Sequence, residues 1–241
     1  MSTFNNIFDK ILAENEISVT SQQKKTFESL YTALVETNKL YNLTAVTDEQ
    51  GVAGLHFADS LMALPYLDSN TTKKLLDIGC GAGFPCLPIA IARPEIQVLG
   101  VDSTSKKVDF STNFAQNNDI KNFSSLSARA EELAKTEARE SFDFVCARAV
   151  ARLNVLAELC LPFVKVGGYF LAMKGSKGKE ELNEAENGIK KLGAEVISID
   201  EKELILPNEV QTRTFILIKK VAKTPSAYPR AYGKIKKSPL K

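Results

Sequence analysis

An apolar run that leads directly into three closely spaced glycines is the strongest constraint on this chain. In LLDIGCGAGFP, residues 75–85, the run ends at Ile78 and is followed by Gly79, Gly81 and Gly83. Glycines let the backbone turn tightly and approach a ligand where a Cβ atom would clash. The turn also places the free amide donors at the start of the next helix beside that ligand. We therefore expect a strand–turn–helix unit that binds a small ligand at the carboxyl end of its strand.

From Lys73 onward, short apolar or β-rich runs alternate with stretches of helical character. The expected strands are residues 74–78, 97–101, 122–126, 142–147, 168–173, 195–199 and 213–219. The expected helices between them are residues 86–93, 105–117, 152–164 and 178–192. This alternation predicts a Rossmann-like α/β fold, in which a seven-stranded, mostly parallel sheet is covered on both faces. Too few residues separate the last two runs for a helical crossover, so we expect the last strand to be antiparallel.

The first 70 residues have the patterns of helices. Four apolar residues near the start repeat at helical spacing: Phe4, Ile7, Phe8 and Ile11. Thr20 and Gln23 have the spacing of a capping box, and a third helix is expected near residues 50–66. The end of the chain, after Lys220, looks irregular. We therefore divide the chain into an N-terminal helical extension, a ligand-binding domain and a basic C-terminal tail, at residues 1–70, 71–221 and 222–241.

The composition is that of an ordinary globular protein, since 44% of the 241 residues are hydrophobic and 25% are charged. No apolar stretch reaches the roughly 20 residues that a bilayer span requires, and the N-terminus lacks the features of a secretory signal. The four cysteines have no CxxC spacing and His56 is the only histidine, so we expect no metal site. Free thiols fit a reducing compartment, and we expect a cytoplasmic protein without membrane contacts.

Positive charge is concentrated at the C-terminal end. Residues 222–241 contain six basic residues and no acidic one, which leaves 25 basic and 29 acidic residues in 1–221. A mildly acidic body with a cationic tail favours a polyanionic partner that binds at one end of the molecule. A tail that is only solvated is the alternative, and charge alone does not decide between the two.

The glycine spacing distinguishes between two kinds of cofactor. A dinucleotide site requires GxGxxG, whereas this chain has GxGxG followed by Phe84 and Pro85. With Asp77 just before the turn, the pattern resembles the class I S-adenosylmethionine-dependent methyltransferases, in which this acidic residue lies near the methionine end of the cofactor. The glycines, Gly81 and Gly83 among them, pack under the cofactor in that class. Asp102, at the end of the next strand, is placed to accept hydrogen bonds from both ribose hydroxyls, although a simple loop or capping acid is the alternative.

Eight segments narrow the resemblance further. They are NLTAVTD, HFADSL, DIGCGAGFP, DSTSKK, ARAEEL, ARAVARL, MKGSKGKEEL and YPRAYGKIKKSPL, in this order over residues 42–240. Together they resemble the glucose-inhibited division protein B family, whose members methylate N7 of a single guanine in bacterial small-subunit (16S) ribosomal RNA. Ile235 departs from the family, which usually has a proline at this position, and the departure concerns only the geometry of the tail.

The resemblance implies cofactor contacts at Gly79, Phe84, Ala130, Glu131 and Arg148. Ala130 and Glu131 follow the third expected strand, where the adenine should lie, although Glu131 could also be an ordinary helix-start acid. Phe84, at the entrance of a helix, is expected to pack beside the ligand and not only in the core. Arg148 ends an apolar strand, where an unpaired cation is costly. It should therefore meet an anion: the methionine carboxylate, an RNA phosphate or a nearby aspartate.

The implied reaction needs no catalytic residue, because guanine N7 has an in-plane lone pair and no proton to remove. His56, Asp59 and Ser60 share one helix face, which we interpret as packing the extension over the cofactor cleft. The implied substrate is RNA of the small ribosomal subunit, not DNA. Phosphate contacts, which orient without choosing sequence, are expected from Lys174, Lys177, Lys179, Arg230, Lys234, Lys236 and Lys237.

Other functions stay open on the sequence. A small-molecule methyltransferase would use the same cofactor domain, although the cationic tail and the basic MKGSKGK stretch favour RNA. A non-catalytic RNA-binding assembly factor could keep a cofactor pocket. A nicotinamide-dependent dehydrogenase is disfavoured, because the third glycine of its motif is missing.

Overall fold

The computed structural model describes residues 2–68 and 70–240, so Lys241 of the tail lies outside the described residues. The sheet contains β1 (Lys74–Ile78), β2 (Gln97–Asp102), β3 (Phe123–Ser127), β4 (Phe142–Arg148), β5 (Val164–Lys174), β6 (Ala194–Leu206) and β7 (Glu209–Lys220). Their order is β3-β2-β1-β4-β5-β7-β6. Strand β7 is antiparallel to both β5 and β6, and the other pairings are parallel. The predicted α/β fold and its antiparallel last strand are confirmed.

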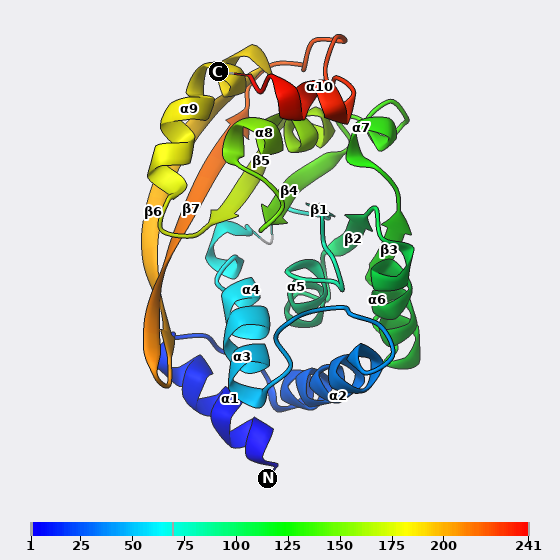
Figure 1. Ribbon diagram of the computed structural model, residues 1–241, viewed down its shortest axis with the longest axis vertical. Coiled ribbons are helices and arrows are strands. Elements are labelled where there is room, and N and C mark those ends of the chain that lie inside the picture. The colour runs from blue at the N-terminus through cyan, green and yellow to red at the C-terminus, as the bar shows by residue number, and fades with distance from the viewer. Residues whose placement is uncertain (1, 69, 241) are drawn as a thin grey trace.

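Helices cover both faces of this sheet, as Figure 1 shows with α7–α10 on one side and α1–α6 on the other. The α-helices are α1 (Thr3–Glu14), α2 (Ser21–Asn38), α3 (Glu49–Gly51), α4 (Asp59–Leu61), α5 (Cys86–Ala92), α6 (Ser105–Asn117), α7 (Ala130–Leu133), α8 (Leu153–Cys160), α9 (Gly178–Lys191) and α10 (Tyr232–Lys237). One π-helical segment and two 3₁₀ turns complete them: η1 (Val52–Ala58), η2 (Leu64–Tyr66) and η3 (Leu161–Phe163).

Two clusters of buried apolar side chains lie on the two faces of the sheet. The first cluster joins Phe8, Phe27 and Phe57 of the N-terminal helices to residues of β1 and α5, so residues before and after position 70 share one core. The second cluster joins β4 and β5 to α8 and α9, and it also contains Ile235 of α10. The glycine turn after β1 is thus held between two packed layers.

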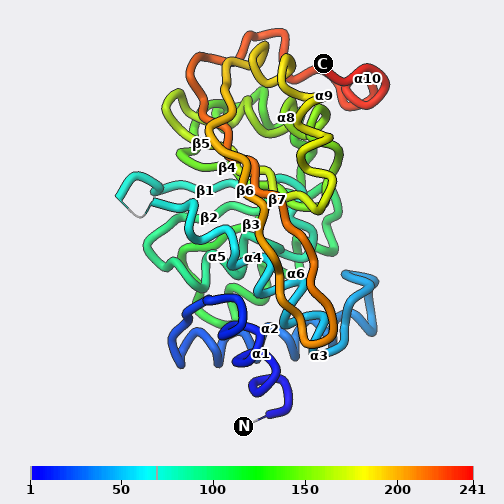
Figure 2. The backbone as a smooth tube through the Cα atoms, turned by 90° about the vertical axis from the view of Figure 1, so that its left-hand side faces the viewer, coloured from blue at the N-terminus to red at the C-terminus, as the bar shows by residue number. Residues whose placement is uncertain are grey.

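Strands β6 and β7 extend well beyond the expected residues 195–199 and 213–219. They form a long hairpin that reaches the N-terminal helices, and Figure 2 shows it running down toward α1 and α3. At its far end, the Asn15 side chain donates to the Ile205 carbonyl at 2.8 Å and accepts from the Ile205 N–H at 2.9 Å. The side chains of β6 alternate between exposed and partly buried positions, so the near-continuous apolar run of a strand buried on both faces is missing there.

Two expectations about local structure need correction. The third N-terminal helix is not uniform, because its middle part, η1, is wound as a π-helix in which the Asp59 N–H donates to the Gly54 carbonyl. The tail after Lys220 is not irregular throughout, because Tyr232–Lys237 form α10 and Ile235 is fully buried. Ile235, which replaces a usual proline, therefore contributes an apolar anchor.

Two further observations concern membrane spans and metal sites, neither of which the sequence predicted. Within residues 2–68 and 70–240, every helix is too short or too polar to cross a membrane. The same residues contain no group of three or more His, Cys, Asp or Glu side chains arranged to hold a metal ion.

Candidate functional site

The turn after β1 has a backbone that only glycine adopts readily. Gly79, Gly81 and Gly83 have φ values of +76°, +56° and +100°. The Gly79 N–H donates to the Val101 carbonyl at 2.7 Å, which ties the turn to the end of β2. A Cβ atom on Gly79 would lie 2.4 Å from Cγ2 of Val150, so a side chain is excluded there by space as well as by conformation. The glycine backbone of the turn is therefore as the sequence predicted, and the close approach of a ligand to it stays a prediction.

Asp102 ends β2 beside this turn. Its Oδ2 accepts from the Gly81 N–H at 2.9 Å and its Oδ1 accepts from the Thr104 N–H at 2.8 Å. The two bonds fix the carboxylate and tighten the glycine turn. Each carboxylate oxygen can accept about two hydrogen bonds, so acceptor capacity remains on both oxygens. The expected loop role and the expected ligand role of Asp102 are thus compatible.

Asp77 is a fully buried carboxylate on β1. Its Oδ2 accepts from the Cys86 N–H at 3.2 Å, while its Oδ1 has no hydrogen-bond partner among the described residues. Burial raises the pKa of Asp77 to about 7, although the hydrogen bonds of Cys86 and the charge of Arg148 oppose the rise. A buried carboxylate with an unused oxygen is suited to a cationic ligand group.

A cavity of about 210 Å³ opens between the ends of β1, β2 and β3. Four of the expected cofactor residues line it: Gly79, Asp102, Ala130 and Glu131. Its walls also contain Val150, Leu159 and Tyr232, which the sequence did not indicate. Ligand pockets usually measure about 300–1,000 Å³, so this cavity accommodates only part of a cofactor-sized molecule.

Phe84 connects the glycine turn to the N-terminal extension. It is largely buried, and its ring stacks on His56 of η1 with centroids 4.7 Å apart and planes 11° from parallel. Thr44 Oγ1 lies 3.0 Å from His56 Nε2. Burial lowers the pKa of His56 to about 4, and the charge of Arg148 contributes to the lowering. His56 is therefore a neutral packing residue at physiological pH.

Arg148 meets the nearby aspartate that was one of its three expected partners. Its Nη1 donates to Asp59 Oδ2 at 2.8 Å and to the Leu55 carbonyl at 3.0 Å. The other oxygen of Asp59 accepts from Arg213 Nε at 2.8 Å, so one buried carboxylate holds two arginines. The sequence did not indicate Arg213, nor that Asp59 pairs with two arginines, because these ion pairs join segments far apart in the chain.

A second cavity, of about 340 Å³, adjoins this cluster. It is lined by Leu55, His56, Asp59, Arg148, Ala149, Met173, Lys174, Gly175, Glu181 and Arg213. The segment after β4 borders both cavities, because Arg148 and Ala149 line the second one and Val150 lines the first. Ala149 has a φ of +57°, a conformation that non-glycine residues rarely adopt. Two hollows therefore meet at one strained turn beside Gly79.

Three of the cations expected to bind phosphate form ion pairs within the protein. Lys174 Nζ lies 2.7 Å from Glu181, and its side chain is largely buried. Arg230 forms a two-pronged ion pair with Glu158, whose side chain is 0% exposed. The exposed Lys179 pairs with Glu201 at 2.6 Å. The buried Glu158 needs the compensating charge of Arg230. Phosphate binding by Arg230 and Lys174 stays a prediction, and these ion pairs compete with it.

The remaining four cations are presented to solvent. Lys177 lies before α9, and Lys234, Lys236 and Lys237 lie on α10, all with exposed side chains. The four cysteines are free and buried, and burial raises the pKa of the Cys86, Cys146 and Cys160 thiols. Those three thiols are therefore unsuited to act as nucleophiles.

Comparison with known proteins identifies the family. A family model described as rRNA small subunit methyltransferase G matches residues 23–206. The chain is 46% identical over 231 residues to the ribosomal RNA small subunit methyltransferase G of Staphylococcus carnosus, and 95% of each chain is covered. The chain belongs to the rRNA small subunit methyltransferase G family. The protein of the same name from Staphylococcus aureus is 44% identical over 229 residues, with 95% of each chain covered. The resemblance to the glucose-inhibited division protein B family is thereby confirmed.

A solved structure of another protein supports the same fold for this family member. The O-methyltransferase from Bacillus cereus, solved in complex with SAH, aligns with a TM-score of 0.55 at 13% identity. The alignment covers 88% of this chain and 96% of that one. At this identity the likeness concerns the fold, and the predicted class I methyltransferase fold is confirmed.

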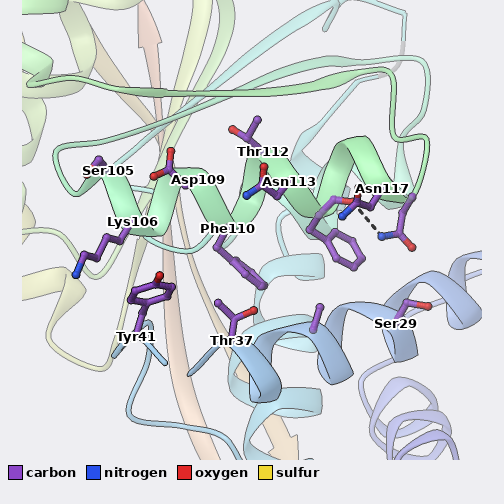
Figure 3. Close-up of a pocket in the computed structure, with 13 residues that line it drawn as sticks. Ser29, Thr37, Tyr41, Ser105, Lys106, Asp109, Phe110, Thr112, Asn113 and Asn117 are labelled. Atoms are coloured by element: carbon purple, nitrogen blue, oxygen red, sulfur yellow. Dashed lines mark hydrogen bonds between the residues drawn. The ribbon is translucent and has the colours of Figure 1, made fainter. Parts of the chain in front are cut away.

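A larger hollow of this family member, about 790 Å³, lies away from the glycine turn. Figure 3 shows it between α2 and α6, with Tyr41 below Lys106. The Lys106 ammonium lies 5.0 Å from the centroid of the Tyr41 ring. None of the residues expected to bind the cofactor lines this groove. The larger groove therefore shares no residue with the expected cofactor site, which stays a prediction at the glycine turn.

Proposed function

We propose that the protein transfers a methyl group from S-adenosylmethionine to N7 of a guanine in the ribosomal RNA of the small subunit. Membership of the rRNA small subunit methyltransferase G family supports this function. The observation that carries it is the turn with glycines at 79, 81 and 83, which Asp102 holds beside a cavity lined by Ala130 and Glu131. The bacterial cytoplasm, where small subunits are made, is the proposed location.

The residues present fit the cofactor. Asp102 retains acceptor capacity for the ribose hydroxyls, and Ala130 and Glu131 form the wall proposed for the adenine. Asp77, with its unused buried oxygen, is the proposed partner of the positively charged methionine end. Gly81 and Gly83 are proposed to pack under the cofactor, with Phe84 beside it. Arg148 is proposed to bind the methionine carboxylate. When bound, S-adenosylmethionine supplies an electrophilic methyl group on a sulfonium.

The protein's contribution to such a reaction is alignment and charge. Guanine N7 needs no general base, and His56, being neutral and stacked on Phe84, is not required as one. Correct alignment of reacting groups can lower a barrier by about 7–11 kcal/mol in favourable cases. The cavity of about 340 Å³ on the far side of Arg148 is the proposed site for the target base. We therefore name no catalytic residue.

RNA binding is proposed for the exposed cations. The major groove of an A-form helix is too deep and narrow to admit protein side chains, so the target guanine must lie in a loop or be extruded. Lys177, Lys234, Lys236 and Lys237 are the proposed phosphate contacts, since their side chains are exposed. Such contacts hold the RNA without reading its sequence. DNA is not a proposed substrate.

The test is a methyl-transfer assay with mapping of the product. Small ribosomal subunits that lack the modification are incubated with the protein and methyl-tritiated S-adenosylmethionine. The RNA is then treated with borohydride and aniline, which cleave the chain at N7-methylguanosine. We expect label in the small-subunit RNA and a single cleavage position. Label without cleavage would refute methylation at N7, and binding of cofactor without label would indicate a non-catalytic assembly factor.

The role of the tail is tested separately. Replacing Lys234, Lys236 and Lys237 with alanine should raise the KM for RNA and flatten its salt dependence, while the affinity for S-adenosylhomocysteine changes little. The exposed Lys190, which pairs with Glu186 on α9, offers a matched control as Lys190→Ala. Unchanged RNA kinetics in the triple variant would refute phosphate binding by the tail.

A further inference from the structure

The C-terminal helix α10 reaches the cavity beside the glycine turn. Tyr232, the first residue of α10, lines this cavity together with Leu159 of α8 and residues 128–131, which follow β3. In Figure 1, α10 lies beside α7 and α8, above the ends of the strands that form the cavity. The basic C-terminal segment therefore contributes an aromatic residue to the wall of the candidate cofactor site.

Several contacts fix α10 at this place. Arg230, just before the helix, pairs with the buried Glu158 of α8, and its backbone N–H donates to the same carboxylate at 2.8 Å. Ile235 is fully buried in the cluster formed by β4, β5, α8 and α9. Leu240 packs closely on Gly188 of α9, since a Cβ atom added to Gly188 would lie 2.8 Å from the Cβ of Leu240. The position of Tyr232 is thus determined by packing on both sides of it in the chain.

The ring of Tyr232 has no polar role in the protein itself. Its hydroxyl forms no hydrogen bond with residues 2–68 and 70–240, and the ring is only partly buried against the apolar cluster. One side of the ring therefore packs on the protein, and the residue also forms part of a cavity wall. Aromatic rings gain extra stability when they pack against another aromatic ring.

We propose that Tyr232 is a cofactor-binding residue whose ring packs against the adenine of S-adenosylmethionine, so that the C-terminal tail is part of the cofactor site. This inference rests on the proposed function, which supplies the cofactor. Its support is the shared cavity, because Tyr232 and Leu159 line it together with Asp102, the proposed ribose ligand, and Ala130, at the proposed adenine position. The cavity of about 210 Å³ suits the adenosine part of the ligand rather than the whole of it.

The first experiment uses fluorescence, because the natural sequence contains no tryptophan. Tyr232→Trp places a single indole in the cavity wall, and its emission should change saturably when S-adenosylhomocysteine is added. Tyr228→Trp is the matched control, because Tyr228 packs on the same apolar cluster but does not line the cavity. An unchanged Tyr232→Trp spectrum at saturating ligand, with binding verified by calorimetry, would overturn the proposal.

The second experiment measures affinity for S-adenosylhomocysteine by calorimetry, without RNA. Tyr232→Ala should weaken binding about tenfold, as expected for loss of one aromatic contact. The affinity of Tyr232→Phe should stay within about twofold of that of the natural protein, and the same is expected of Lys190→Ala, an exposed residue of α9. Tyr232→Leu, which keeps apolar bulk, replaces the alanine variant if thermal melting shows that the latter unfolds.

The outcomes separate the two proposals. If the unchanged protein binds no S-adenosylhomocysteine, the proposed function fails. If the unchanged protein binds it, and the alanine or leucine variant binds it equally well, only the role of Tyr232 is refuted.

Discussion

Replacing Asp77 with asparagine should stabilise the folded protein, and the gain should increase with pH. The folded state raises the pKa of this buried carboxyl from 3.8 to about 7. Because the folded pKa is raised, the contribution of Asp77 to stability is fully present below the unfolded pKa and is lost as the pH rises through the folded pKa. Asparagine has the same shape but does not titrate. The free energy of unfolding of the Asp77→Asn variant therefore does not fall in this way as the pH rises.

The magnitude follows from the two pKa values. When Asp77 is ionised in both the folded and the unfolded state, a rise in its pKa from 3.8 to about 7 lowers the free energy of unfolding by about 4 kcal/mol, since one pKa unit is about 1.4 kcal/mol. At pH 5 the Asp77 carboxyl is already ionised in the unfolded chain and is still protonated in the folded protein, so about 2 kcal/mol of this cost is present. Between pH 5 and pH 8, the free energy of unfolding of the natural protein should therefore fall by roughly 2–3 kcal/mol relative to that of Asp77→Asn.

Urea unfolding of both proteins at pH 5 and pH 8, in the absence of cofactor, measures this difference. Asp143→Asn is the control, because hydrogen bonds and the charge of Lys165 lower the pKa of Asp143, which therefore stays ionised across this range. The same Asp77→Asn variant should bind S-adenosylhomocysteine more weakly, since it has lost the charge proposed to meet the methionine end. A free-energy difference that is equal at both pH values would refute the argument from burial.

Two further predictions concern single positions. Gly79→Ala should weaken S-adenosylhomocysteine binding at least about tenfold in calorimetry, because the new Cβ would lie 2.4 Å from Val150 Cγ2 at a φ of +76°. Adding Val150→Ala should restore part of the affinity. If it restores none, a clash with Val150 is not the reason for the loss. Arg230→Met should lower the free energy of unfolding by about 3–5 kcal/mol, because it leaves the buried Glu158 uncompensated. Lys236→Ala should change it by less than about 0.5 kcal/mol in the same urea experiment, and equal effects of the two substitutions would show that Arg230 is not structural.

Much of the fold could be predicted because it depends on local periodicity. The alternation of apolar runs and helical stretches predicts all seven strands, and the short connection before β7 predicts its direction. The glycine turn is equally local, since the backbone at Gly79, Gly81 and Gly83 requires a residue without a side chain. These features follow from neighbouring residues, so one sequence is sufficient to find them.

The partners of charged and aromatic side chains could not be predicted in the same way. Arg230 and Lys236 look equivalent in a basic tail, yet Arg230 neutralises Glu158, which is distant in the chain, while Lys236 is exposed. Asp59 likewise holds Arg148 and Arg213 through contacts between three separate elements. Composition reports the net charge of a segment, but only the packed structure shows which charges remain available to a ligand.

The tail therefore joins the two binding functions proposed for this protein. Lys234, Lys236 and Lys237 are exposed on α10, whereas Tyr232 at the start of the same helix lines the cofactor cavity. Because Arg230 and Ile235 anchor α10 on the protein, the helix presents its exposed lysines and Tyr232 as one rigid element. The lysines are therefore held in a defined position relative to the cavity wall. A tail that acted only as a flexible tether would leave its charges free to move independently of that wall.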